Sequence, residues 1–282
     1  MSVKSYRTAL SIQRSFVYVV MAVLAVLALL PIYILLVNAT RTSGEINAGI
    51  ALLPGTNILN NWEFLTSRGF RITQGFYNSA FIALVTTALN VYFSAMTAYG
   101  LHVYKFKGRN VLWAAILVVI MLPASLSVMG LAEFVTQVGL RDSYIPLIVP
   151  AIAGAGAVLF IRQYMASIMV TPLIEAARID GASEFYAFNR IMLPILTPVL
   201  AAQSIFTFVA SWNNFLIPLV LIDSERRFTL PMLVQTLRGD LFRTEFGAIY
   251  LGIAVSIVPI IIFYCFMSRF IISGLTLGGV KE

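Results

Sequence analysis

The sequence predicts an all-α polytopic membrane protein with six transmembrane helices and both termini in the cytoplasm. Hydrophobic residues make up 60% of the 282 residues, only 11% are charged, and the mean hydropathy is +0.90. A soluble domain typically carries about 25% charged residues. A bilayer core is crossed by a helix of about 20 mostly apolar residues, and six segments without Asp, Glu, Lys or Arg are long enough.

The six charge-free segments set the expected organisation of the chain, and they lie at residues 15–40, 72–104, 110–132, 143–161, 191–222 and 246–268. Runs of this length should be helical, because backbone amides cannot stay unpaired in lipid, whereas a β-barrel would alternate over shorter runs. We expect a cytoplasmic N-terminus at 1–15, a first transmembrane helix at 16–37, an extracytoplasmic loop at 38–75, a core domain at 76–270 and a cytoplasmic tail at 271–282. Within the core we expect transmembrane helices at about 76–101, 110–131, 144–165, 195–222 and 247–268, with a cytoplasmic loop at 167–194.

The first segment follows Lys4, Arg7 and Arg14 and in this respect resembles a signal peptide. Its apolar core is too long for one, and no clear small-residue cleavage site follows, so we interpret it as a retained helix.

Basic residues predict the orientation, because Lys and Arg in short loops stay on the cytoplasmic side. With the N-terminus inside, the inside segments carry 11 of the 19 Lys and Arg residues but only four of the 12 Asp and Glu residues. The sequence KFKGR at 105–109 is the clearest part of this bias. The basic composition is therefore a signal of topology and predicts no nucleic-acid partner.

The stretch EAARIDGAS at 175–183 interrupts the apolar chain on the expected inner face. Thr171 and Pro172 are expected to begin a helix as its cap and first residue. Gly181 is expected to end that helix in the left-handed conformation, and Ser183 to cap a second short helix. Glu175 is expected to pair with Arg178, three residues later.

The composition of this first helix favours docking into a partner. Ala176 and Ala177 leave a bare surface that permits close approach of another backbone, and Leu173 and Ile174 offer apolar anchors. The alternative is a helix lying on the lipid surface, which would favour bulky apolar and basic residues over two acids and two alanines.

Uncharged polar residues gather in the segment 195–222, and the candidates for contact with a solute are Gln203, Thr207, Ser211 and Asn213. Two interpretations stay open. These side chains hydrogen-bond between helices, or they line a wet passage for a neutral polar solute such as a sugar, together with the aromatic rings of the same segment.

Catalytic motifs are missing from the sequence. It contains no HExxH, no GxSxG, no phosphate loop GxxxxGK[ST] and no paired carboxylates within a span, so we expect no enzyme, no metal and no cofactor bound by this chain. The charge-free spans also lack the buried acids with which many ion-coupled carriers bind their coupling ion. A secondary carrier is therefore the less favoured alternative.

The segment EAARIDGASEFYAFNRIMLPILTP at 175–198 resembles the EAA loop of ABC importer permeases, whose pattern is E-A-A-x-x-x-G with a downstream L-P. Further matches are Asn78-Ser79, Ala98-Tyr99, Met121-Leu122-Pro123, Trp212-Asn213-Asn214-Phe215, Thr229-Leu230-Pro231 and the terminal GLTLGGVK. Together they resemble the carbohydrate-uptake, MalG-like branch of binding-protein-dependent transport inner membrane components. The chain departs from that branch at Asn214, where members often carry an acid.

This resemblance implies a type I ABC importer permease fold in a bacterial or archaeal cell membrane. It implies a homologous second permease subunit, two copies of a cytoplasmic ABC ATPase that use ATP and Mg, and an extracytoplasmic solute-binding protein. The cargo would be a sugar, with an oligosaccharide favoured; the alternative is another polar solute. The implied ATPase-coupling helix comprises Glu175, Ala176, Ala177, Arg178, Asp180, Gly181 and Ala182.

Overall fold

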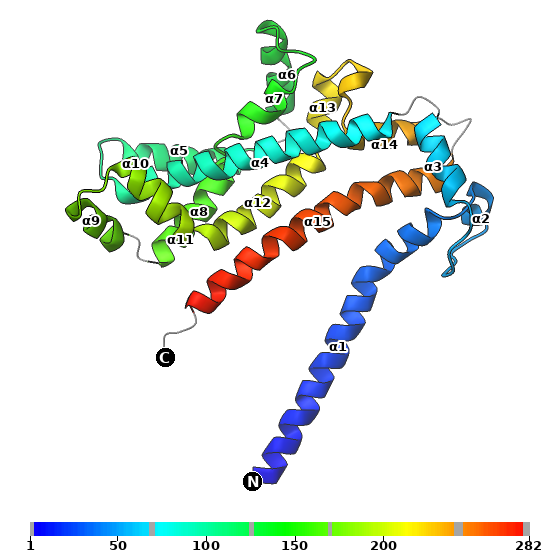
Figure 1. Ribbon diagram of the computed structural model, residues 1–282, viewed down its shortest axis with the longest axis horizontal. Coiled ribbons are helices and arrows are strands. Elements are labelled where there is room, and N and C mark those ends of the chain that lie inside the picture. The colour runs from blue at the N-terminus through cyan, green and yellow to red at the C-terminus, as the bar shows by residue number, and fades with distance from the viewer. Residues whose placement is uncertain (1–2, 68–70, 124–126, 169–170, 240–244, 279–282) are drawn as a thin grey trace. The chain divides into compact units, whose positions relative to one another are not determined.

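The computed structural model describes residues 3–67, 71–123, 127–168, 171–239 and 245–278, and all regular secondary structure in these ranges is helical. This confirms the predicted all-α class. The α-helices are, in order (Figure 1), α1 Val3–Asn38, α2 Ser43–Asn47, α3 Ile58–Ser67, α4 Ile72–Val103, α5 Arg109–Met121, α6 Ser127–Gln137, α7 Ile145–Ile148, α8 Ala155–Ser167, α9 Thr171–Ile179, α10 Glu184–Tyr186, α11 Leu193–Ile195, α12 Thr197–Trp212, α13 Leu216–Leu221, α14 Leu230–Gly239 and α15 Phe246–Gly278. Short 3₁₀ turns occur at η2 Val149–Ala151 and η4 Glu225–Arg227, and a π-helical turn at η3 Ala187–Met192.

Four helical stretches within the described residues are long and apolar enough to cross a bilayer, namely Gln13–Asn38, Ile72–Val103, Ile145–Ser167 and Phe246–Ile271. A fifth results if Glu184–Ile195 and Thr197–Trp212, which meet at 79°, form one broken span. The remaining predicted segment contains α5, which is apolar but has only 13 residues. Each of the six charge-free segments thus contains apolar helix, although three of them are interrupted.

The interruptions have local causes. Pro123 disfavours a helical residue before it, and Leu122 is accordingly extended at ψ 129°, so the predicted helix 110–131 is divided between α5 and α6. Pro150 has no N–H to continue the helical ladder of α7, which ends at Ile148. The segment 195–222 is broken at residues 213–215, between α12 and α13.

The chain forms two compact units, residues 1–70 with 236–255, and residues 71–235 with 256–282. In the first unit, Ser43 accepts a hydrogen bond from the N–H of Phe246, 2.9 Å away, at the start of α15. Asn61 donates to the carbonyls of Ala39 and Arg41 at 2.9 and 3.0 Å. These contacts hold the end of α1, helix α3 and the start of α15 together.

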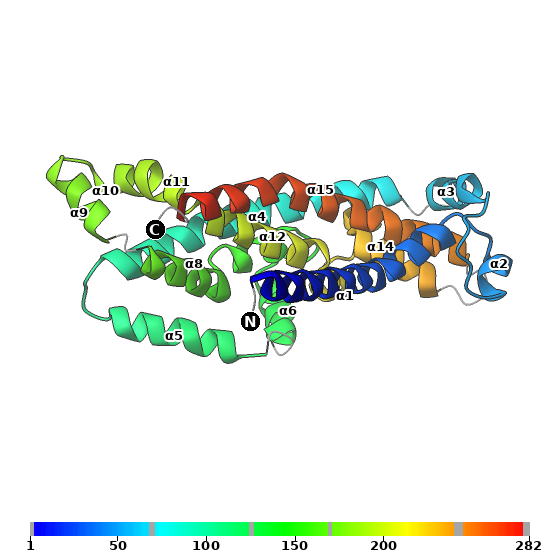
Figure 2. The same ribbon diagram turned by 90° about the horizontal axis from the view of Figure 1, so that it is seen from below.

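In the second unit, α4, α8 and α12 pack side by side (Figures 1 and 2). Ala95 and Ala98 of α4 are fully buried, and such small residues let helices approach closely where lipid provides no hydrophobic drive. The end of α12 is fixed by Trp212, which is 1% exposed and donates to the carbonyl of Ser256 at 3.0 Å.

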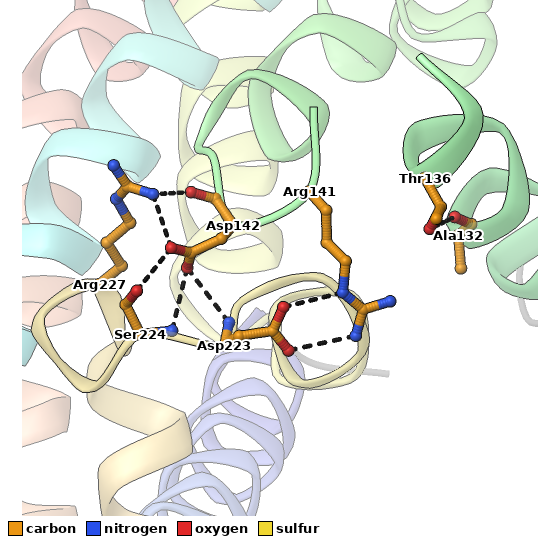
Figure 3. Close-up of polar contacts among 7 residues, drawn as sticks. All are labelled: Ala132, Thr136, Arg141, Asp142, Asp223, Ser224 and Arg227. Atoms are coloured by element: carbon orange, nitrogen blue, oxygen red, sulfur yellow. Dashed lines mark hydrogen bonds and ion pairs between the residues drawn. The ribbon is translucent and has the colours of Figure 1, made fainter. Parts of the chain in front are cut away.

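A polar network joins the loop after α6 to the segment after α13 (Figure 3). Arg141 binds Asp223 with two hydrogen bonds, Nε to Oδ2 at 2.8 Å and Nη2 to Oδ1 at 3.1 Å. The Asp142 carboxylate accepts from the N–H groups of Asp223 and Ser224, from the Ser224 hydroxyl at 2.5 Å and from Arg227 at 2.8 Å. Asp142 has a left-handed φ of +55°, which Asp tolerates better than most residues.

This network makes the stability of the loop depend on pH. The hydrogen bonds from Ser224, followed by that from Asp223 and the charge of Arg227, lower the pKa of Asp142 from 3.8 to about 2. A carboxyl with a lowered pKa stabilises the fold above its ordinary pKa, and this stabilisation is lost as the pH falls through the folded value.

We predict that Asp142→Asn lowers the thermal midpoint of the detergent-purified protein at pH 5, because the substitution removes the carboxylate. The difference from the wild type should narrow between about pH 4 and 2, where the native Asp142 becomes protonated. Melting curves across this range provide the measurement, and Glu133→Gln, which changes a carboxylate of α6 outside the network, is the control. A difference that stays constant down to pH 2 would contradict the assignment.

Candidate functional site

The predicted docking unit begins with helix α9, Thr171–Ile179. Gly181 ends it in the left-handed conformation, with φ +80°. The N–H of Gly181 donates to the carbonyl of Arg178, and that of Ala182 to the carbonyl of Ala177, each at 3.0 Å. These are the two hydrogen bonds of a Schellman motif, so the predicted role of Gly181 is confirmed.

The second short helix is capped as predicted, since the Ser183 hydroxyl accepts from the N–H of Tyr186 at the start of α10. The first helix begins at Thr171 itself, which is therefore its first residue and not its cap. Pro172 becomes the second helical residue and still lies in the first turn, where its missing N–H costs no hydrogen bond.

One face of α9 is buried and the other is open. Ile174 is 0% and Ala177 7% exposed, and Ile174 belongs to the core cluster of α4 and α8. Glu175, Ala176 and Ile179 point away from that core, and Ile179 is 86% exposed. The prediction of one bare surface formed by both alanines is wrong, because consecutive helical residues are about 100° apart.

Arg178 pairs with Glu184 and not with Glu175. Its Nε lies 2.6 Å from Glu184 Oε1, while Glu175 makes no ion pair within the described part of the chain. The predicted pair is wrong because the turn at Gly181 brings Glu184 back beside the last turn of α9. The spacing of residues within one helix cannot predict the contact between Arg178 and Glu184, because it depends on the turn that follows the helix.

Glu184 also binds the end of α4. Its Oε2 accepts from the hydroxyl of Tyr104 at 2.5 Å and from that of Tyr99 at 3.2 Å. The Arg178 guanidinium lies 5.4 Å from the centre of the Tyr104 ring. Arg178, Glu184, Tyr99 and Tyr104, hereafter the Glu184 junction, therefore tie the docking unit to the C-terminal end of α4. Of these four residues only Arg178 was a predicted site residue, and Tyr99 belonged to the matching pair Ala98-Tyr99.

A second candidate site is a cavity of about 270 Å³ beside the middle of α4, lined by Thr86, Leu131, Pro146, Leu147, Pro150, Ala151, Thr207, Ala210, Ser211, Asn214 and Ile217. The structure thus brings two of the predicted solute residues, Thr207 and Ser211, to one wall. Gln203 is buried and Asn213 is exposed, and neither lines the cavity. Asn214, and not the predicted Asn213, lies on the cavity wall.

A chain of hydrogen bonds runs along one side of the cavity. Gln203 donates to the hydroxyl of Thr207 at 3.0 Å, and Thr207 donates to Asn90 Oδ1 at 2.9 Å. Asn90 in turn donates to the carbonyl of Ala151 at 2.5 Å, at the end of η2. The interpretation of helix-to-helix hydrogen bonding is therefore confirmed for Thr207, which binds Asn90 of α4, whereas Gln203 bonds within α12. The second interpretation, contact with a solute, stays a prediction for Ser211.

The apolar spans, and between them a largely apolar cavity with a few hydroxyl and amide groups, are features of a multi-pass membrane protein. The chain belongs to the family of binding-protein-dependent transport system inner membrane components, whose pattern it matches over residues 91–275. It is a permease subunit of an ABC transporter in the cell membrane, and a transport protein rather than an enzyme.

Two relatives are arabinooligosaccharides transport system permease proteins AraQ. The protein of Bacillus subtilis (strain 168) is 36% identical, covering 92% of each chain, and that of Halalkalibacterium halodurans is 38% identical, covering 92% of this chain and 94% of the relative. A chain in the crystal structure of a bacterial ABC transporter involved in the import of the acidic polysaccharide alginate superposes with a TM-score of 0.78 at 21% identity. The superposition covers 95% of this chain and 98% of that one, and confirms the permease fold.

We predict that Glu184→Gln loosens α9 without unfolding the protein. Losing the charge weakens the hydrogen bonds that Glu184 accepts from Arg178, Tyr104 and Tyr99, so amide exchange in α9 should accelerate several-fold. Hydrogen–deuterium exchange in detergent measures this. Glu175→Gln is the matched control, because Glu175 lies on the same unit without an ion partner among the described residues. Equal exchange in the two variants would contradict the junction.

Proposed function

We propose that this chain forms one half of the membrane pathway of an ATP-driven importer and that its cargo is a sugar, with an oligosaccharide favoured. A homologous second permease would complete the pathway, two cytoplasmic ATPase subunits would bind ATP and Mg, and an extracytoplasmic binding protein would deliver the solute. Family membership supports this assembly. The proposed topology has both termini and α9 on the cytoplasmic side.

The architecture of α9 supports its assignment as the coupling helix. Ile174 and Ala177 seat the helix in the core, and the Glu184 junction ties it to α4, so a force on its outer face is passed to the spans. On the outer face, the small side chain of Ala176 permits close approach of a partner, Ile179 projects an apolar side chain, and Glu175 carries a negative charge. Such a face suits an apolar groove with a basic rim on the partner. In this proposal Arg178, Gly181 and Ala182 shape the unit, whereas Glu175, Ala176 and Asp180 are open to contact.

The sugar assignment is supported by the relatives and by the cavity. Two relatives are named for the transport of arabinooligosaccharides. The cavity wall contains hydroxyl and amide groups but no charged side chain, which suits a neutral polar solute better than an ion. Thr207 and Ser211 are the predicted solute residues that lie on this wall.

We predict that Ile179→Asp releases the ATPase. Burying an Ile side chain in a partner's groove contributes about 1.5–3 kcal/mol, so its loss and the burial of a charge should weaken ATPase binding by at least about tenfold. The measurement is retention of the ATPase on the tagged permease pair. Ile50→Asp is the matched control, since Ile50 is 84% and Ile179 86% exposed, and Ile50 lies in the proposed extracytoplasmic loop.

The same preparation tests the wider proposal in proteoliposomes. Uptake of arabinotriose, lactose or trehalose should require ATP, the ATPase and the loaded binding protein. If Ile179→Asp retains the ATPase as the wild type does, the assignment of the outer face of α9 as the coupling surface is wrong. Sugar uptake by this chain without ATPase or ATP would instead establish a secondary carrier.

A further inference from the structure

Two broken helices meet at the cavity beside α4. Pro150 and Ala151 of η2 lie on the cavity wall just before the first break, at residues 152–154, and Asn214 lies on it within the second, at residues 213–215 between α12 and α13. Non-helical backbone at membrane depth is tolerated where it is buried in protein or lines a polar cavity, and such breaks mark the solute sites of many transporters. Asn90 satisfies the carbonyl of Ala151 at the first break, and Asn214 accepts from the N–H of Ile217 at 3.4 Å after the second.

Thr86 lies on this wall and carries a buried hydroxyl. It is 2% exposed, and its hydroxyl has no hydrogen-bond partner in the described part of the chain. A threonine within a helix usually donates to the carbonyl four residues earlier, as Thr87 does to Ala83 at 2.6 Å and Thr97 to Phe93 at 2.8 Å. An unsatisfied buried hydroxyl costs stability, and a residue kept at such a cost next to a cavity points to a ligand.

The chemistry of the wall limits what that ligand is. Ser211 and Asn214 add a hydroxyl and an amide, while Leu147, Pro150 and Ala210 add apolar surface on which a sugar ring can pack. The wall has no charge to neutralise a carboxylate or an ammonium group. At about 270 Å³ the cavity lies just below the range of pockets for drug-sized ligands, so it accommodates one sugar ring and not a whole oligosaccharide.

We propose that this chain itself carries a subsite for one neutral sugar ring, in which the Thr86 hydroxyl hydrogen-bonds a hydroxyl of the solute and Ser211 and Asn214 contact its rim. The subsite rests on the proposed import of sugars. It forms when the two helix breaks shift, because the Thr86 hydroxyl is covered in the present conformation. The breaks are suited to this movement, since element ends absorb changes in backbone angles.

Thr86→Val tests the subsite, because valine keeps the shape of threonine and removes the hydroxyl. In proteoliposomes containing the complete importer, we expect the initial uptake of arabinotriose, or of whichever of lactose and trehalose is transported, to fall about fivefold, the ratio that corresponds to one neutral hydrogen bond. Thr87→Val is the matched control and should transport at the wild-type rate, because Thr87 is the next residue of α4, is also buried and does not line the cavity.

Protection from a thiol reagent gives a second readout that needs no change at Thr86. In a Cys265→Ser background, Ser211→Cys should react several-fold more slowly with a methanethiosulfonate when the transported sugar is delivered. Asn213→Cys, which is exposed and outside the cavity, should react at the same rate with or without sugar. An acidic uronate oligosaccharide should protect neither position.

The outcomes separate the two proposals. If the wild-type importer takes up none of the sugars, the proposed function fails. If it takes them up and Thr86→Val matches Thr87→Val, the subsite alone is overturned. Where Thr86→Val does not reach the membrane, the decision passes to Ser211→Cys: protection by the sugar supports the subsite, and an unchanged reaction rate overturns it.

Discussion

Hydrogen bonding of the backbone is the constraint on which this molecule depends, because lipid offers no partner for a free amide or carbonyl. Continuous helix satisfies it in α4, and in α1 and α15 except at Pro31 and Pro259, which have no N–H to donate. Elsewhere the chain departs from helix, and side chains take over: Asn90 binds the carbonyl of Ala151, and Asn214 accepts from Ile217. Ala151 and Asn214 both lie on the wall of the cavity beside α4, which is where the sugar subsite is proposed.

The same principle explains how the docking unit keeps its shape outside the spans. The free carbonyls at the end of α9 are satisfied by the N–H groups of Gly181 and Ala182, and the first amides of α10 by Ser183. Because the ends of both short helices are hydrogen-bonded, they resist unwinding when a force acts on the unit. Glu184 binds both Arg178 of the unit and Tyr104 at the end of α4. Displacement of the unit therefore acts on α4 through a charged contact, whereas a flexible loop would absorb the movement.

The sequence predicted what depends on neighbouring residues and missed what depends on distant ones. Gly181 and Ser183 were assigned correctly because a left-handed glycine and a serine cap act within four residues. Glu184 was missed because its partners Tyr99 and Tyr104 are 85 and 80 residues away. Thr86 looked like any other residue of a charge-free span, and only the packing of α4 against the helix breaks sets it apart from Thr87. The prolines and asparagines of the segments 143–161 and 191–222 were the available signal of those breaks.

Helix α4 connects the two candidate sites. Thr86 and Asn90 face the cavity region from its middle, and Tyr99 belongs to the Glu184 junction near its end. Thirteen residues of α-helix separate Thr86 from Tyr99, which corresponds to about 20 Å along a single rigid rod. A shift of the docking unit therefore reaches the cavity without a relay of separate elements. Under the proposed function this geometry requires that sugar in the cavity and ATPase on α9 influence each other reciprocally, since a ligand biases a conformational equilibrium only through contacts that differ between the states.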